Sequence, residues 1–175
     1  MAFSLFDATI PNFLQGIGAV RGLVGKAEAF CAETGTAPEE IIGARLIDDM
    51  LPFAYQVKSV AVHSQGAIEG VRKGQFSPDM SEPPASFAAM IERLDTAQAA
   101  LEAVGRDEVE QFIGRDMAFV IGERRMEFTA ETFLMTFSTP NFFFHATTAY
   151  AILRGKGVAI GKRDFIGQIR LKVPA

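Results

Sequence analysis

The sequence has no tryptophan, a single cysteine and two histidines among its 175 residues. Because Cys31 is alone, the chain cannot form an internal disulfide, and a reducing compartment is expected. Its basic residues are scattered and its net charge is −4, which argues against a nucleic-acid partner because phosphate neutralisation needs a basic patch. The first seven residues lack the basic start of a signal peptide and carry Asp7. We therefore expect a cytoplasmic protein.

Sequence motifs of common enzyme classes are missing too. The chain contains no Gly-x-Ser-x-Gly elbow, no P-loop and no Glu-x-x-His motif. Two close glycines, Gly16 and Gly18, lie inside an expected helix with no strand before them, so they are not a dinucleotide fingerprint. Cys31 lies at the end of that helix, where the helix dipole disfavours a thiolate. We predict no catalytic residue and no cofactor-binding residue, and the sequence leaves open whether the protein is an enzyme.

Hydrophobic periodicity predicts four long helices. Pro11 stands early in the first, which either starts after this proline or is kinked there. Pro52 interrupts the second, so we expect a kink near Asp48–Asp49. Apolar and polar residues alternate over 115–128 around a glycine turn, which predicts a short β-hairpin before the last helix. The expected helices cover about residues 5–33, 39–72, 85–104 and 129–155.

These elements predict an all-α four-helix bundle forming a single domain over residues 1–175. Phenylalanine dominates the expected core, with 16 copies, and three consecutive phenylalanines at 142–144 are expected to form the packing face of the last helix. The tail at 161–167 is expected to dock on the bundle. Four glycines of the first helix favour close approach by another helix, within the chain or across a dimer: Gly16, Gly18, Gly22 and Gly25.

The run from Thr132 to Leu153 is long and apolar enough to raise a transmembrane interpretation. It also contains Pro140, Asn141, His145 and several hydroxyl side chains. Polar groups of this kind are costly in lipid, so we expect a buried helix and no membrane partner.

The same run holds the main candidate site. Asn141 and His145 are four residues apart, so their side chains share one helical face, and Thr148 continues it. In the second helix Gln56 and His63 are seven apart, again on one face, with Asp49 seven residues before Gln56. A bundle can bring the two faces together in its interior.

Two interpretations of this cluster remain open at the level of sequence. Residues at i and i+4 have the spacing of His-x-x-x-His metal sites, although an amide is a poorer ligand than an imidazole. Alternatively, the polar groups satisfy one another, with Gln56 bonded to Asn141 across the bundle and fixing helix register. His63 is expected at the surface or rim.

Four segments carry a resemblance to a known family: SLFDATIPNFL at 4–14, ARLIDDMLPF at 44–53, PNFFFHATTAYAILR at 140–154 and GKRDF at 161–165. Together they resemble a bacterial family of unknown function within the DinB/YfiT-like superfamily. The resemblance implies an up-down-down-up four-helix bundle, often a homodimer.

The resemblance also implies chemistry to compare with this chain. Better-characterised relatives hold a divalent metal with three histidines, one on the second helix and a pair on the fourth, and some are transferases or isomerases using low-molecular-weight thiols. By position, His145 matches one histidine of the pair, Asn141 replaces the other, and Gln56 stands near the second-helix ligand.

We therefore predict an uncharacterised DinB-like protein, a homodimer, that binds a small molecule at a polar cluster without a strong metal site. One alternative is a metal-dependent thiol transferase or isomerase with a weakly bound divalent ion; another is a structural dimerisation module. The weak metal candidate is His145 with Asn141, Gln56 or His63. The predicted ligand-binding residues are Asp49, Gln56, Asn141, His145 and Thr148.

Overall fold

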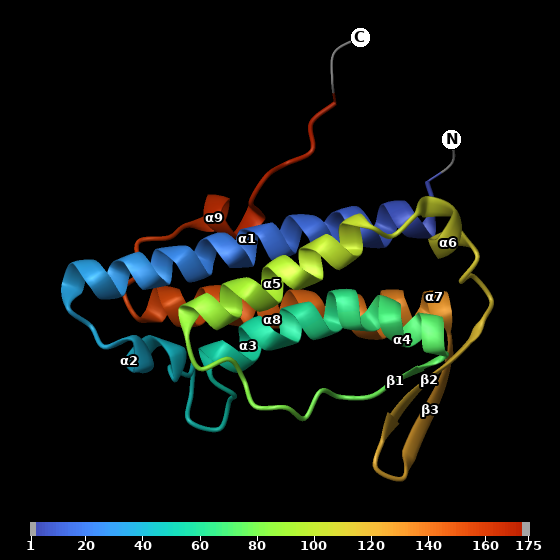
Figure 1. The fold of residues 1–175 in the computed structure, drawn as a ribbon, viewed down its shortest axis with the longest axis horizontal. Coiled ribbons are helices and arrows are strands. Elements are labelled where there is room, and N and C mark those ends of the chain that lie inside the picture. Colours follow the sequence, from blue (N-terminus) through green and yellow to red (C-terminus); the bar gives the residue numbers. More distant parts are fainter. Residues whose placement is uncertain (1–2, 173–175) are drawn as a thin grey trace.

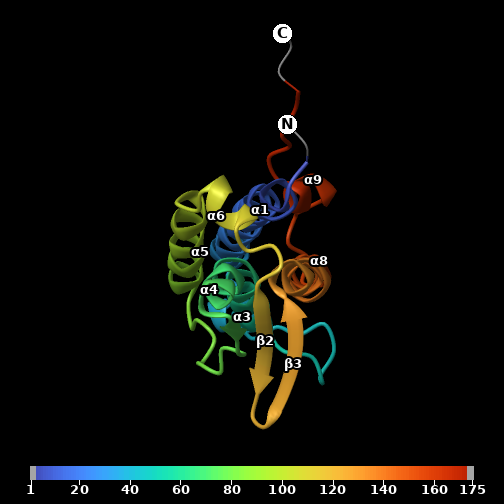
Figure 2. The same cartoon turned by 90° about the vertical axis from the view of Figure 1, so that its right-hand side faces the viewer.

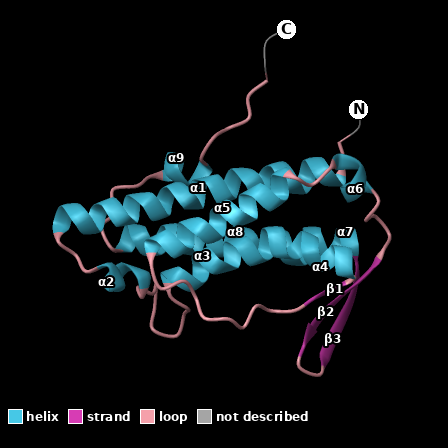
Figure 3. Cartoon of the chain, in the orientation of Figure 1, coloured by secondary structure: helices cyan, strands magenta, loops and turns pink. Residues whose placement is uncertain are grey.

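The computed structural model describes residues 3–172, and its body consists of helices lying alongside one another (Figures 1 and 3). A small sheet projects at one end of these helices (Figures 1 and 3). The helices are α1 Leu5–Thr34, α2 Pro38–Ile42, α3 Phe53–Ala61, α4 Ala67–Lys73, α5 Phe87–Glu102, α6 Arg106–Glu110, α7 Ala130–Thr132, α8 Thr139–Gly155 and α9 Lys162–Ile166, with π-helical segments η1 Val62–Gly66 and η2 Phe133–Ser138.

Helix α1 begins before Pro11, not after it. Ser4 caps the helix: its hydroxyl accepts from the Asp7 amide, and the Asp7 carboxylate accepts from the Ser4 amide. The helix ends at Thr34 and is capped by Gly35, whose φ of 73° is the left-handed conformation that glycine adopts at little cost. A proline in the second turn is therefore accommodated inside a helix fixed at both ends.

The expected second helix is interrupted by a loop at residues 43–52 rather than kinked. Helix α2 ends at Ile42, and helix α3 begins at Phe53 with Pro52 as its extended N-cap. Leu46, whose spacing predicted an inward position, is 53% exposed. Proline disfavours the helical conformation of the residue before it and lacks the N–H that a helix interior needs, so the chain breaks where periodicity alone suggested continuity.

The predicted hairpin is present. Strand β2 (Asp116–Ile121) pairs antiparallel with β3 (Arg124–Thr129), and the turn contains Gly122 at a φ of 56°. A two-residue strand, β1 (Gln75–Phe76), pairs in parallel with β2, giving the order β1-β2-β3. Sequence analysis did not predict β1 because two residues carry no alternating pattern.

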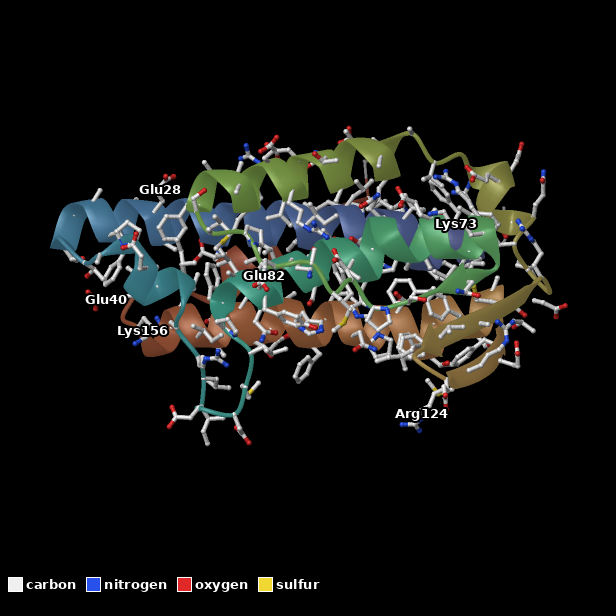
Figure 4. All side chains as sticks on the ribbon, turned by 60° about the horizontal axis from the view of Figure 1, so that its bottom comes forward. Glu28, Glu40, Lys73, Glu82, Arg124 and Lys156 are labelled. Atoms are coloured by element: carbon white, nitrogen blue, oxygen red, sulfur yellow. The ribbon has the colours of Figure 1, made fainter. Side chains whose placement is uncertain are left out.

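Fully buried phenylalanines form much of the core, and Phe13 meets Phe142 edge-on with ring centroids 5.0 Å apart. The expectation that all of residues 142–144 pack inward is wrong: Phe143 is 41% and Phe144 is 55% exposed. Successive residues on a helix point about 100° apart, so three in a row cannot share one face. Charged side chains such as Glu28, Glu40 and Arg124 lie on the outside (Figure 4).

The tail docks on α1 as expected. The Gln15 side-chain amide donates to the Ile166 carbonyl over 2.9 Å, and Lys26 pairs with Asp164 at 2.6 Å. Figure 2 shows α9 beside α1 and above α8. Of the four glycines in α1, one lies against another helix: a Cβ on Gly16 would stand 2.5 Å from the Phe142 ring. Within residues 3–172, no helix combines the length and apolarity required to cross a membrane.

Candidate functional site

A cavity of about 200 Å³ lies between α3, α8 and the start of the sheet. Both histidines line it, together with Asn141. Three phenylalanines form its apolar side, and the remaining polar side chains come from α3 and the segment that follows β1. The other lining residues, which include two more apolar side chains, are Tyr55, Lys58, Ser59, Val62, Phe76, Pro78, Asp79, Phe119 and Phe137.

The two imidazoles are brought together by paired irregularities in their helices. His63 lies in η1, and η2 immediately precedes α8, which carries His145. The Ser138 hydroxyl donates to the His63 carbonyl over 3.0 Å and ties the two π-helical segments together. The rings are nearly parallel, 15° apart, with centroids separated by 5.6 Å. Single-turn π segments are frequent at functional sites, where they shift the face that a helix presents.

Gln56 fixes the proton of His145. Its amide nitrogen donates to the Leu51 carbonyl over 2.7 Å, so its carbonyl oxygen Oε1 is the atom that faces His145. Nδ1 of His145 lies 2.7 Å from this oxygen. A carbonyl oxygen only accepts, so Nδ1 carries the proton, and Nε2 of the neutral ring keeps its lone pair.

Both histidines are uncharged at neutral pH. Burial lowers the pKa of His63 to about 4, with a smaller contribution from His145, and burial lowers the pKa of His145 to about 4 as well. His145 is 9% exposed. Nδ1 of His63 is buried and has no hydrogen-bond partner among the described residues. His63 is thus half-buried inside the cluster and carries an unsatisfied atom, where the sequence suggested a surface or rim position.

Asn141 contributes an acceptor to the cavity. Its side-chain nitrogen donates to the Phe137 carbonyl one turn earlier, over 2.7 Å, which leaves the side-chain oxygen available. The bond between Gln56 and Asn141 considered from the sequence is not formed, because Gln56 is committed to His145 and Leu51. The Asn141 side chain therefore bonds to the preceding helical turn through its nitrogen and offers its oxygen to the cavity.

A buried lysine next to the cavity was missed by sequence analysis. Lys58 is 1% exposed, and its ammonium donates to the carbonyls of Asp79 (2.7 Å) and Ser81 and lies 3.2 Å from the Asp79 carboxylate. Arg93 binds the other carboxylate oxygen at 2.6 Å. Burial alone would raise the pKa of Asp79, but hydrogen bonds from Ser81, Lys58 and Arg93 hold it well below its usual range. The sequence feature that could have indicated this buried lysine is its position as the single lysine in the largely apolar run 53–62.

Three of the five predicted ligand residues do not line the cavity. Asp49 is exposed in the loop at 43–52. Thr148 is buried on α8, but its hydroxyl donates to the Phe144 carbonyl over 2.8 Å and satisfies its own helix. Gln56 acts behind His145, whereas Asn141 and His145 line the cavity directly.

The donor set is poor for a divalent metal. Within residues 3–172, no group of three or more His, Cys, Asp or Glu side chains is placed to hold one ion. Nδ1 of His145 is engaged by Gln56, and both carboxylate oxygens of Asp79 are paired with cations. Two neutral imidazoles and an amide oxygen remain, which is fewer strong ligands than a structural or catalytic zinc site uses.

Comparison with known proteins places the chain in a family. Residues 5–166 match the model of a domain of unknown function, DUF1993. The chain belongs to the DUF1993 family. No curated protein sequence matches it. The crystal structure of a DinB family member protein from Shewanella denitrificans superimposes with a TM-score of 0.82 at 24% identity, covering 97% of this chain and 96% of that one. The DUF1993 protein thus has the DinB-like fold that the sequence resemblance implied, and at this identity the likeness concerns the fold alone.

Proposed function

We propose that this DUF1993 protein binds a small molecule in the cavity lined by His63, Asn141 and His145. The observation that carries the proposal is the buried Nδ1 atom of His63, a residue that lines the cavity: within residues 3–172 this atom has no hydrogen-bond partner. Leaving a buried polar atom unsatisfied costs about 1–3 kcal/mol, so such atoms call for an explanation. A ligand that pairs with the imidazoles would supply one. A cavity of about 200 Å³ suits a compound smaller than a typical drug.

The proposed architecture is a single DinB-like domain over residues 1–175. In it α1, α3 with α4, α5 and α8 are the four helices of an up-down-down-up bundle. The side-by-side packing of these helices in Figure 1 supports it, as does the superposition on the DinB family structure. We also propose a cytoplasmic location and no nucleic-acid partner, based on the net charge of −4 and the lone cysteine.

A homodimer is part of the proposal. Gly18 and Gly22 lie one turn apart on the exposed side of α1, and a Cβ on either would meet nothing within 4 Å. That surface admits close approach by a second helix. Light scattering at micromolar concentration is expected to give the dimer mass, with Gly18→Glu shifting it toward the monomer. A monomer mass for the parent protein would end the dimer proposal. A dimer whose histidine cavity binds no compound would instead support a purely structural dimerisation module.

Ligand-observed NMR with a fragment library tests small-molecule binding. We expect hits on the parent protein, at least a tenfold loss of affinity in His145→Ala, and little change in Thr148→Ala. Thr148 is a matched control because it lies on the same helix, is buried, and does not line the cavity. Hits that bind the His145→Ala variant as tightly as the parent would place binding elsewhere and contradict the proposal.

A metal-dependent thiol transferase or isomerase is the second candidate. Its support is the pair of imidazole rings with centroids 5.6 Å apart and the free Nε2 of His145. In that case His145, with His63 or Asn141, would hold a weakly bound ion able to lower the pKa of a thiol. Elemental analysis of protein purified without added metal distinguishes the two candidates. Near-stoichiometric metal that disappears in His145→Ala would favour the transferase.

A further inference from the structure

We infer that the ligand of this cavity is a neutral molecule with an apolar, ring-sized body and a single hydroxyl or N–H group that donates a hydrogen bond. The inference rests on the proposed function and adds the chemical class of the ligand. It follows from which polar atoms around the cavity are already committed and which remain free.

Hydrogen bonds within the protein leave two defined acceptors at the cavity, and neutral His63 adds one N–H donor and one acceptor. Nε2 of His145 keeps a lone pair because Nδ1 donates to Gln56, and Asn141 keeps its side-chain oxygen because its nitrogen donates to Phe137. The nearby ammonium of Lys58 already donates to the Ser81 carbonyl and to the carbonyl and carboxylate of Asp79. The hydroxyls of Tyr55 and Ser59 can donate or accept, so they favour neither a donating nor an accepting ligand. A ligand with one donor can therefore bond to Nε2 of His145 or to the Asn141 oxygen, the two acceptors whose positions are fixed by hydrogen bonds to Gln56 and Phe137.

Charge at the site selects against ions of either sign. Lys58 and Arg93 face a single carboxylate, Asp79, so an organic cation would meet a local excess of positive charge. An anion would need hydrogen-bond donors; the N–H groups of Lys58 are already used, and the unpaired Nε of Arg93 belongs to a residue that does not line this cavity. Both imidazoles are neutral and add no charge of their own. Burying an ion without a partner is costly, so a neutral ligand is favoured.

The apolar side of the cavity favours a flat body. Phe119 and Phe137 lie with ring centroids 4.8 Å apart, and Phe76 lies 6.2 Å from Phe119. Tyr55 meets His145 edge-on at 6.0 Å. Aromatic rings pack well edge-to-face or offset against such walls. A benzene-sized ring with a donating group combines both requirements.

Four one-ring probes separate the alternatives: phenol (neutral donor), toluene (neutral, no donor), benzoate (anion) and benzylamine (cation at pH 7). Each is titrated into the full chain with a chelator present, and binding is followed through the ¹⁵N and ¹H signals of the imidazoles. The protein has two histidines, so both reporters are in the cavity. We expect phenol to bind at least about tenfold more tightly than each of the other probes, because each lacks the donor or carries a charge.

Variants of the cavity residues test which side chains produce the preference for phenol. His145→Leu and Asn141→Leu are each expected to reduce the preference for phenol over toluene at least threefold, and Thr148→Val is expected to keep it. Asn141 is half-buried, so its variant serves even if His145→Leu fails to fold. Tighter binding of benzoate, benzylamine or toluene, with shifts of the imidazole signals, would overturn the ligand class while leaving the proposed function intact. No shift with any probe would overturn the ligand class, and with no fragment hits at His145 it would overturn the proposed function too.

Discussion

At the scale of single residues, Gln56 determines what His145 can do. The Leu51 carbonyl orients the Gln56 amide, and the amide then holds the proton on Nδ1 of His145. A buried imidazole with one defined tautomer presents one defined atom, Nε2, to the cavity. The asparagine at 141 acts differently, because it supplies an acceptor where the resemblance expects a second histidine.

The two histidines of the cavity make stability depend on pH. Their pKa values are lowered from 6.5 to about 4, so the unfolded chain binds more protons than the folded one between these values. Stability is complete above pH 6.5 and is lost as the pH falls toward 4. From pH 7 to pH 5 we expect a loss of up to about 2 kcal/mol from His145, and less from the half-buried His63.

Urea unfolding at pH 7 and pH 5 measures this loss. In His145→Gln, which stays neutral, the difference between the two pH values is expected to shrink by about the share of His145. The carboxyl of Asp79 keeps its charge over this range, because its hydrogen bonds hold its pKa well below the usual value. An unchanged difference in the variant would contradict the neutral, buried state of this ring.

Sequence analysis at this scale named polar residues of the cluster but not their partners. It named both histidines, Gln56 and Asn141, because polar residues in apolar helices are conspicuous. The partner of His145 lies 89 residues away, and no local pattern specifies that contact. The same holds for the contact of Lys58 with Asp79, which depends on how the segment after β1 returns across α3.

At the scale of elements, the glycines of α1 have different roles. A Cβ on Gly16 would stand 2.5 Å from the Phe142 ring, which is fully buried against Phe13, whereas Gly18 has open space. Gly16→Ala is expected to destabilise by about 1 kcal/mol or more, because overpacking exceeds the gain in helix propensity. Gly18→Ala is expected to stabilise by up to about 1 kcal/mol. Thermal unfolding of both variants measures the difference, and equal stabilisation would contradict the close packing of α1 on α8.

The segment after β1 is held to α3 by a buried ion pair. Lys58 is 1% exposed and reaches Asp79 and Ser81, so Lys58→Met is expected to destabilise by roughly 2 kcal/mol and to speed hydrogen exchange over residues 77–86. The control is Arg21→Met, which removes an exposed ion pair with Asp95 and is expected to cost no more than about 1 kcal/mol. Similar losses in both variants would argue against the tether.

Element boundaries were predictable where local chemistry sets them. The capping box at Ser4 and the left-handed Gly35 define α1, and Gly122 defines the hairpin turn. The break at 43–52 was not predicted, because its apolar spacing mimics a helix that Pro52 forbids. The π-helical segments leave no signature in hydrophobic period over five or six residues.

At the scale of the whole molecule, helical periodicity and the resemblance together predicted the DinB-like fold. The cavity could not be predicted from the sequence, because it forms where η1, η2 and β2 meet. Its walls combine residues from Tyr55 to His145, and only the assembled fold brings them together. A second hollow of about 170 Å³, between α1, α8 and α9 near Phe165, is the natural competitor for a small ligand.

The most direct test of the central claim is the long-range ¹H–¹⁵N spectrum of the two imidazoles, recorded before and after saturation with the tightest fragment. Before addition, His145 should appear as the neutral tautomer protonated at Nδ1. On saturation the signals of both His63 and His145 should move, because both rings line the same cavity. If the fragment binds while both imidazoles stay unchanged, and the signals of Phe165 and its neighbours move instead, the binding site is the hollow beside α9 and the central claim is wrong.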